Sequence, residues 1–122
     1  MDRYLSDEHV AQRARVADYA RQADAPVARE LDATSRFPWD NVKAMGEMGL
    51  LGIPVPKEYG GQGLDNMSYI LTVEEMAKVD ASHAITISAH TTLGSGPILQ
   101  FGNEDQKKRY LPTLATGEVL GG

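Results

Sequence analysis

The chain contains 122 residues, of which 42% are hydrophobic and 24% are charged, as in an ordinary globular domain. This composition excludes intrinsic disorder and a collagen-like structure, and the lack of cysteine excludes disulfides, thiolate catalysis and cysteine-ligated metals. A formal net charge of −5 argues against general binding to nucleic acid phosphates. We expect a single domain over residues 1–122, and a cytoplasmic location because the first residues show no secretory signal pattern.

The N-terminal quarter of the chain has a helical pattern. Ser6 is followed by two acidic residues, which is typical of a helix N-terminus. Beyond it, apolar side chains fall within about a third of a helical wheel; they are Val16, Tyr19, Ala20, Ala23, Val27 and Leu31. Pro26 predicts a kink, or a second helix restarting in near line after Asp24.

The next region alternates between a short helix and irregular structure. Residues 41–48 predict a helix that ends at Gly49. The apolar run 50–56 contains Pro54 and Pro56, which exclude both a helix and a central strand, so we expect it to be extended. The glycine-rich residues 57–63 lack the spacing of a phosphate-binding loop and are interpreted as a chain reversal.

A third helix is expected from Asp65 or Asn66 to about Val79. Its wheel gathers Met67, Ile70, Val73 and Ala77 on one face. Glu74 falls on that apolar face while Glu75 points away, so Glu74 is either a general base or half of a structural ion pair. We favour the ion pair.

Residues 81–103 contain no charged side chain, a length that raises the question of a membrane span. The run is too polar for one, because it carries serines, threonines, two histidines and an interruption at residues 94–97. We expect instead a helix buried on most sides, with His90 a hydrogen-bonded core residue rather than a ligand.

The C-terminal part predicts one more helix and an unusual end. Asn103 can cap a helix that Pro112 would kink or break, with a turn at residues 115–117. Residues 118–122 are an apolar, strand-like run without a partner. The whole pattern predicts an all-α fold, an orthogonal or irregular bundle of about five to six helices.

The residue pattern alone indicates no active site. The three histidines, His9, His83 and His90, are too far apart for a metal-binding pair, and no carboxylate cluster has metal spacing. His9 lies in the first turn of a helix and is interpreted as a surface residue. We therefore assign no catalytic and no metal-binding residue.

Several segments, taken together and in order, resemble the N-terminal domain of the flavin-dependent acyl-CoA dehydrogenase family, with the short-chain, butyryl-CoA type as the suggested subtype. They are Arg36–Trp39, Gly46–Pro56, Glu58–Gly61, Glu74–Ala77, Asp80–Ser82, Gly102–Pro112 and Leu114–Glu118. The resemblance spans nearly the whole chain.

The resemblance implies a function in acyl-CoA oxidation. Members of this family desaturate acyl-CoA thioesters: a glutamate removes the α-proton, a hydride passes to FAD, and the electrons pass to an electron-transferring flavoprotein. They are usually homotetramers. The family's middle β-domain and C-terminal four-helix domain, which carries the catalytic glutamate, are absent from this sequence. The resemblance therefore implies no catalytic or cofactor-binding residue here, and an isolated chain that is inert.

The same resemblance implies that the uncharged helix lines the acyl-chain cavity with Ile85, Thr86, Ala89 and Leu93, whose spacing puts them on one side of a helix. Plain core packing of these four residues is the alternative. For the chain as a whole, two other functions stay open. One is a free-standing, non-catalytic helical module that binds acyl-CoA or a partner protein. The other is a structural subunit that completes a flavin site with a separately encoded partner.

Overall fold

The computed structural model describes residues 2–122, and within this range it is helical, with no strand. After a short 3₁₀ turn at Asp2–Tyr4, five continuous helical stretches follow, as the sequence predicts. Their elements are α1 (Asp7–Tyr19), η2 (Ala20–Asp24), α2 (Ala25–Thr34), α3 (Trp39–Glu47), α4 (Asn66–Ala77), α5 (Ala81–Ala89), η4 (His90–Ser95), α6 (Gly96–Phe101) and α7 (Glu104–Ala115). A further 3₁₀ turn, η3, covers Lys57–Tyr59.

The first stretch is one long rod with a π turn in its middle. Ser6 caps α1 by accepting a hydrogen bond from the backbone N–H of His9, and the His9 ring accepts one from the Ser6 backbone in return. The π turn η2 connects α1 to α2 without a break, and Pro26 lies in the first turn of α2, directly after the π turn. The helical pattern is confirmed, and the irregularity near Pro26 is a π turn rather than a break in the chain's helix.

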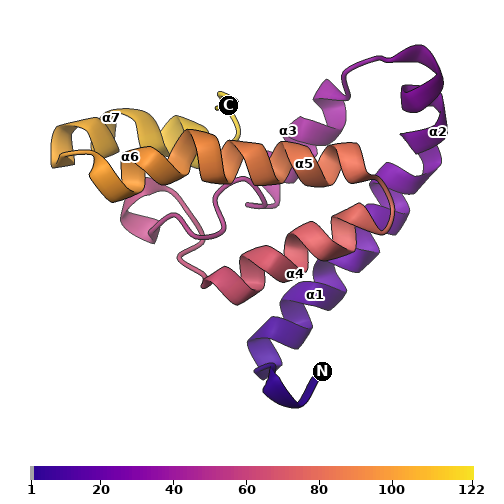
Figure 1. The fold of residues 1–122 in the computed structure, drawn as a ribbon, viewed down its shortest axis with the longest axis horizontal. Coiled ribbons are helices and arrows are strands. Elements are labelled where there is room, and N and C mark those ends of the chain that lie inside the picture. Colours follow the sequence, from indigo (N-terminus) through magenta and orange to yellow (C-terminus); the bar gives the residue numbers. More distant parts are fainter. Residues whose placement is uncertain (1) are drawn as a thin grey trace.

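The helices cross at varied angles (Figure 1). The rod of α1 and α2 runs steeply across the view, and α4 packs against both α1 and α5. The stretch α5–η4–α6 returns over α4 and ends beside α7, with the chain's end near its middle. This arrangement confirms an irregular all-α bundle.

At the centre lies the run 50–56, which is neither helix nor strand. Leu50, Leu51, Ile53 and Val55 are fully buried there. Their backbone is satisfied by the loop that follows: the N–H groups of Gln62 and Leu64 donate to the carbonyls of Gly52 and Ile53, at 2.8 and 2.9 Å. The glycine-rich loop is therefore a chain reversal that pairs with the run.

On α4 the structure corrects the expected roles of two glutamates. The side chain of Glu75 is buried, 11% exposed, and lies 2.6 Å from Lys78 Nζ. Glu74 is exposed, on the same outer face as Met67 and Ile70, and pairs with Lys78 at 3.3 Å. The wheel gave the wrong inner face because apolar side chains lie on both sides of α4, and the buried side includes the hydroxyls of Ser68 and Thr72. Glu74 does form an ion pair, but with Lys78 on the exposed surface of the same helix and not on a buried apolar face.

We expected the uncharged stretch to be buried on most sides, but in the structure residues 81–101 have one buried and one exposed face. Its inner face carries the polar side chains His83, His90, Thr91 and Ser95. Its outer face carries Ile85, Leu93 and Phe101, which are 62%, 66% and 84% exposed. The expected interruption at residues 94–97 is instead the end of the π turn η4, from which α6 continues. Of the helices described, none has the length and apolar character needed to cross a bilayer.

The C-terminal residues also differ from expectation. Pro112 lies inside α7, which continues to Ala115 before Gly117 turns the chain at φ 75°. Residues 118–122, called here the C-terminal segment, form no strand, but they are not without partners. The Val119 N–H donates to the Thr113 carbonyl, and Leu120 packs against the core. The apolar composition therefore belongs to an irregular, partly exposed segment in which Leu120 makes the contact with the core.

Close packing at Gly52 gives a stability prediction. A Cβ at this position would lie 2.7 Å from the Ala115 carbonyl oxygen, so Gly52→Ala must push α7 away from the central run. We expect a loss of about 1–3 kcal/mol in the free energy of unfolding, measured by urea denaturation. Gly122→Ala, where nothing lies within 4 Å, is the control and should be neutral. Equal stability of the two variants would contradict the packing argument.

Candidate functional site

The four residues predicted to line an acyl cavity lie on one outer face of the stretch α5–η4. Ile85 and Leu93 are mostly exposed, and Thr86 and Ala89 are partly exposed between them. Ile87 and His90, on the opposite side, are buried in the core. We call Ile85, Thr86, Ala89 and Leu93 the candidate acyl face. Within this chain the face is uncovered, so its side chains do not pack in the chain's own core.

Local hydrogen bonds hold this face in place. The Asp80 carboxylate caps α5 by accepting from the backbone N–H of Ser82 at 2.8 Å. The Thr86 hydroxyl donates back to the Ser82 carbonyl at 2.9 Å, and Tyr69 on α4 donates to the Ser88 hydroxyl at 3.1 Å. With its hydroxyl bonded to the helix backbone, Thr86 needs no further polar partner and is compatible with an apolar surface.

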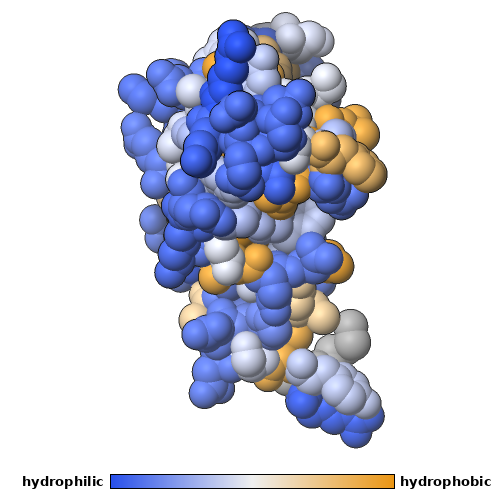
Figure 2. All heavy atoms as spheres, turned by 90° about the vertical axis from the view of Figure 1, so that its left-hand side faces the viewer, coloured by the Kyte–Doolittle hydropathy of each residue, from blue (hydrophilic) through white to orange (hydrophobic). Residues whose placement is uncertain are grey.

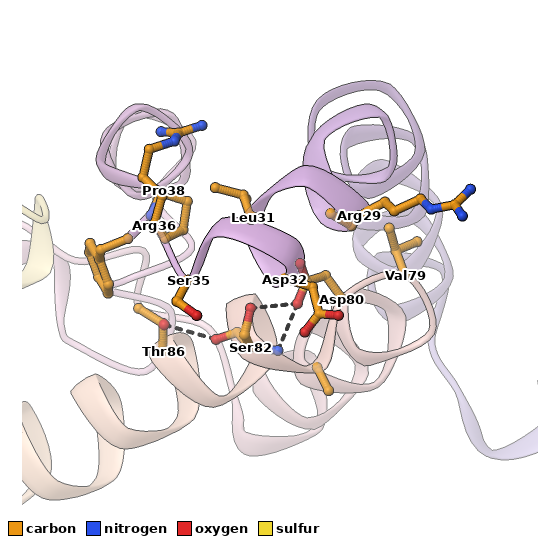
Figure 3. A pocket seen from close by; sticks show the side chains of 13 residues that line it. Arg29, Leu31, Asp32, Ser35, Arg36, Pro38, Val79, Asp80, Ser82 and Thr86 are labelled. Atoms are coloured by element: carbon orange, nitrogen blue, oxygen red, sulfur yellow. Dashed lines mark hydrogen bonds between the residues drawn. The ribbon is translucent and has the colours of Figure 1, made fainter.

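A cleft of about 670 Å³ opens beside the face, between the end of α2 and the start of α5. Thr86 lines it together with Leu31, Asp80 and Ser82 (Figure 3). In Figure 3, Arg29 extends to the right of the view, and Arg36 lies at the left and points upward. Arg36 is paired with Glu30 at 3.0 Å on the exposed surface, an interaction of small energetic value.

The cleft is a poor site for a flavin dinucleotide. Its lining includes the carboxylates of Asp32 and Asp80 as well as two guanidinium groups, so it offers a pyrophosphate no clear excess of positive charge. Within residues 2–122, the buried side-chain atoms that make no hydrogen bond belong to Asp24, His83, Thr91 and Ser95, and none of these residues lines the cleft. The described residues thus do not form a FAD site by themselves. Nor do residues 2–122 bring together three histidine or carboxylate groups that could hold a metal ion.

Below the cleft lies a buried polar cluster that sequence reasoning missed. Asp24, at the end of the first π turn, accepts a hydrogen bond from the Asn41 amide at 2.7 Å. His83 lies between two carboxylates, with Nδ1 3.0 Å from Asp80 and Nε2 3.8 Å from Asp24. Burial raises the pKa of Asp24, and the nearby imidazole partly opposes this rise. Although burial acts to raise the pKa of Asp80, hydrogen bonds from Ser82 keep that pKa below its usual value. The cluster joins η2, α3 and α5 where the cleft begins.

The two remaining histidines have distinct roles. His90 is buried, with Nε2 2.8 Å from the Leu114 carbonyl oxygen and Nδ1 3.1 Å from the Gly121 backbone nitrogen. It is a hydrogen-bonded core residue, as predicted. His9 is not simply a surface residue, because its Nε2 lies 2.8 Å from an Asp65 carboxylate oxygen and so links α1 to the start of α4. The Ser68 backbone N–H and His9 together lower the pKa of Asp65 to about 2.

Comparisons with known proteins agree with this architecture. The family model described as "Acyl-CoA dehydrogenase, N-terminal domain" matches residues 6–118. The acyl-CoA dehydrogenase of Bacillus subtilis is 46% identical over 97% of this chain, and this match covers 31% of that protein. The short-chain specific acyl-CoA dehydrogenase of Clostridium acetobutylicum is 46% identical over 99% of the chain and 32% of its own length.

Solved structures show the same likeness. A chain from a structure described as the electron transferring flavoprotein of Acidaminococcus fermentans superposes with a TM-score of 0.94 at 41% identity, over 99% of this chain and 32% of that one. Butyryl-CoA dehydrogenase of Megasphaera elsdenii gives a TM-score of 0.88 at 37% identity, over 96% and 31%.

The fold and these matches define an acyl-CoA dehydrogenase N-terminal domain. The chain belongs to the acyl-CoA dehydrogenase family, as the sequence resemblance implied. It spans about a third of the length of the curated relatives that it matches.

Burial of His90 predicts how stability depends on pH. Burial lowers the pKa of His90 below the usual value of about 6.5, so the folded state favours the neutral ring. Below that pH the unfolded chain binds a proton that the folded chain does not, and stability falls as the pH falls toward the lowered pKa. We expect the difference in Tm between the wild type and His90→Gln to shrink from pH 7.5 to pH 5.5. A constant difference across that range would contradict the assignment.

Proposed function

We propose that this chain is the N-terminal helical part of a FAD-dependent acyl-CoA dehydrogenase, and that its role there is to line the acyl-chain pocket and to pack on the other domains. FAD, when bound in the complete enzyme, accepts the hydride during desaturation of the acyl-CoA thioester. No catalytic or flavin-binding residue is proposed here, and the isolated chain is expected to be inert. Family membership, together with an uncovered apolar face on α5 and η4, supports this assignment.

The observation that carries the proposal is the exposure of large apolar side chains on the uncharged stretch, whose buried face is partly polar. Four of its polar side chains (His83, His90, Thr91 and Ser95) are buried, while Ile85, Leu93 and Phe101 are exposed to an extent unusual for large apolar residues. Exposing such a surface to water costs free energy, so the surface is suited to contact with another apolar surface. Figure 2, a view from the end where α6 and α7 meet, likewise shows apolar patches on a mainly hydrophilic surface.

The partners proposed for the complete enzyme follow from the same family. They are an acyl-CoA substrate, an electron-transferring flavoprotein as electron acceptor, and further copies in a homotetramer, with the protein in the cytoplasm. One solved relative comes from a structure described as an electron transferring flavoprotein. Curated sequence relatives are described as short-chain specific, which supports a short acyl chain.

The mass of the native protein tests this proposal against its alternatives. We would measure the intact mass of the protein from its natural host under denaturing conditions. A mass far above 13.3 kDa is expected, because the relatives are about three times as long. A mass near 13.3 kDa would contradict the proposal. It would favour a separate module that binds acyl-CoA or a partner, or a subunit that completes a flavin site.

Enlarging the candidate acyl face should change chain-length preference. In the complete enzyme, Ala89→Phe would fill space above the face, and each methylene excluded is worth about 1–3 kcal/mol in discrimination. We expect the ratio of kcat/KM for octanoyl-CoA to that for butyryl-CoA to fall by at least about tenfold. Ala11→Phe, the same change at an exposed position of α1, is the control. An unchanged ratio in Ala89→Phe would contradict the assignment of these residues to the acyl-chain pocket.

A further inference from the structure

The backbone of the C-terminal segment lies in direct contact with the backbone of the second π turn, η4. A Cβ built on Gly94 would lie 2.9 Å from Gly121 Cα, and a Cβ on Gly121 would lie 2.8 Å from Gly94 Cα. Only a pair of glycines allows the two backbones to approach so closely. The contact joins η4 to a segment that follows α7, two parts of the chain that are well separated in sequence.

His90 supplies the polar part of this contact. Its Nε2 donates to the Leu114 carbonyl oxygen at 2.8 Å, and its Nδ1 accepts from the Gly121 backbone N–H at 3.1 Å. Because Nδ1 receives a proton donor, it must carry a lone pair, and the ring must be neutral with its proton on Nε2. Protonation of Nδ1 would set one N–H against another and break the bond to Gly121.

The surroundings of the ring favour this neutral form. Burial, the largest effect, lowers the pKa of His90, while the backbones of Leu114 on α7 and Leu51 in the central run act in the opposite direction. The C-terminal segment contributes the Gly121 N–H, and no charged side chain contributes to the lowered pKa. The hydrogen bond to Gly121 is therefore maintained at neutral pH.

We propose that His90 is a positioning residue that holds the C-terminal segment against η4. Through this contact, called here the latch, the direction in which the chain leaves α7 is coupled to the position of the turn that carries Leu93. His90 and Leu93 belong to the same π turn, with His90 buried and Leu93 66% exposed. A displacement of the segment would therefore be transmitted to the candidate acyl face. This last step rests on the proposed function, whereas the latch itself does not.

Two substitutions separate the two hydrogen bonds of the ring. His90→Asn places an amide oxygen where Nδ1 lies, so it keeps the acceptor for Gly121 and loses the donor to Leu114. His90→Gln places an amide nitrogen near Nε2, so it keeps the donor to Leu114 and loses the acceptor for Gly121. Thr92→Ala, at an exposed hydroxyl of the same turn, is the control.

The readout is hydrogen exchange at the Gly121 amide, resolved by mass spectrometry of the intact protein after fragmentation. We expect exchange about tenfold faster in His90→Gln than in the wild type, and within about threefold of the wild type in His90→Asn and Thr92→Ala. A role in packing alone predicts the opposite order, because glutamine fills more of the ring's volume than asparagine. That order, or equal exchange in both variants, would overturn the latch.

A second measurement needs no variant and guards against misfolding. In wild-type protein with ¹⁵N-labelled histidine, the ring nitrogens of His90 should show Nδ1 unprotonated and Nε2 protonated at neutral pH. A charged ring or the other tautomer would overturn the proposal. Neither measurement uses substrate, so failure of the acyl face in Ala89→Phe would leave the latch standing, and failure of the latch would leave the acyl face standing.

Discussion

The fold depends on burying a backbone that belongs to no helix or strand. Residues 50–55 cross the centre of the bundle, and each buried N–H and C=O there costs free energy unless it is hydrogen-bonded. The loop 61–64 supplies the partners, with Gly63 donating to the Val55 carbonyl at 2.9 Å. Gly52 then lets the end of α7 lie directly on the run, and Gly46 lets residues 116–117 lie directly on α3. The helices around it are arranged to enclose this segment, which explains their varied crossing angles.

Helix ends were predictable because the signals that set them are local. Ser6, Asp65 and Asn103 each cap a helix as expected, since their side chains bond to an N–H only two or three residues ahead. The inner faces of helices were less predictable. Glu74 and Glu75 exchanged their expected environments because an apolar helix has no distinctive wheel, and only tertiary contacts decide which side is covered.

Features that depend on distant partners could not be predicted from the sequence. The polar cluster forms because Asp24 and His83, far apart in the chain, meet under the cleft. The sequence of the C-terminal segment predicted a strand-like conformation, yet contacts with His90 and with the core hold the segment in an irregular form. Spacing alone predicted that the residues of the candidate acyl face share one side of a helix, whereas the exposure of Ile85 and Leu93 depends on which side of the stretch the rest of the chain covers.

The π turns at residues 20–24 and 90–95 have a consequence for how relatives of this chain diverge. A π turn accommodates one residue more than the α-helical turn it replaces, and the extra residue is taken up within the turn itself. Removing a single residue within residues 90–95 would therefore restore a regular helix while α6 kept nearly the same direction about its axis. Phe101 and the residues beside it would keep their neighbours. A one-residue gap at this point in an alignment of relatives would thus mark a change confined to the turn that carries His90 and Leu93, and not a rearranged surface at the end of the helix.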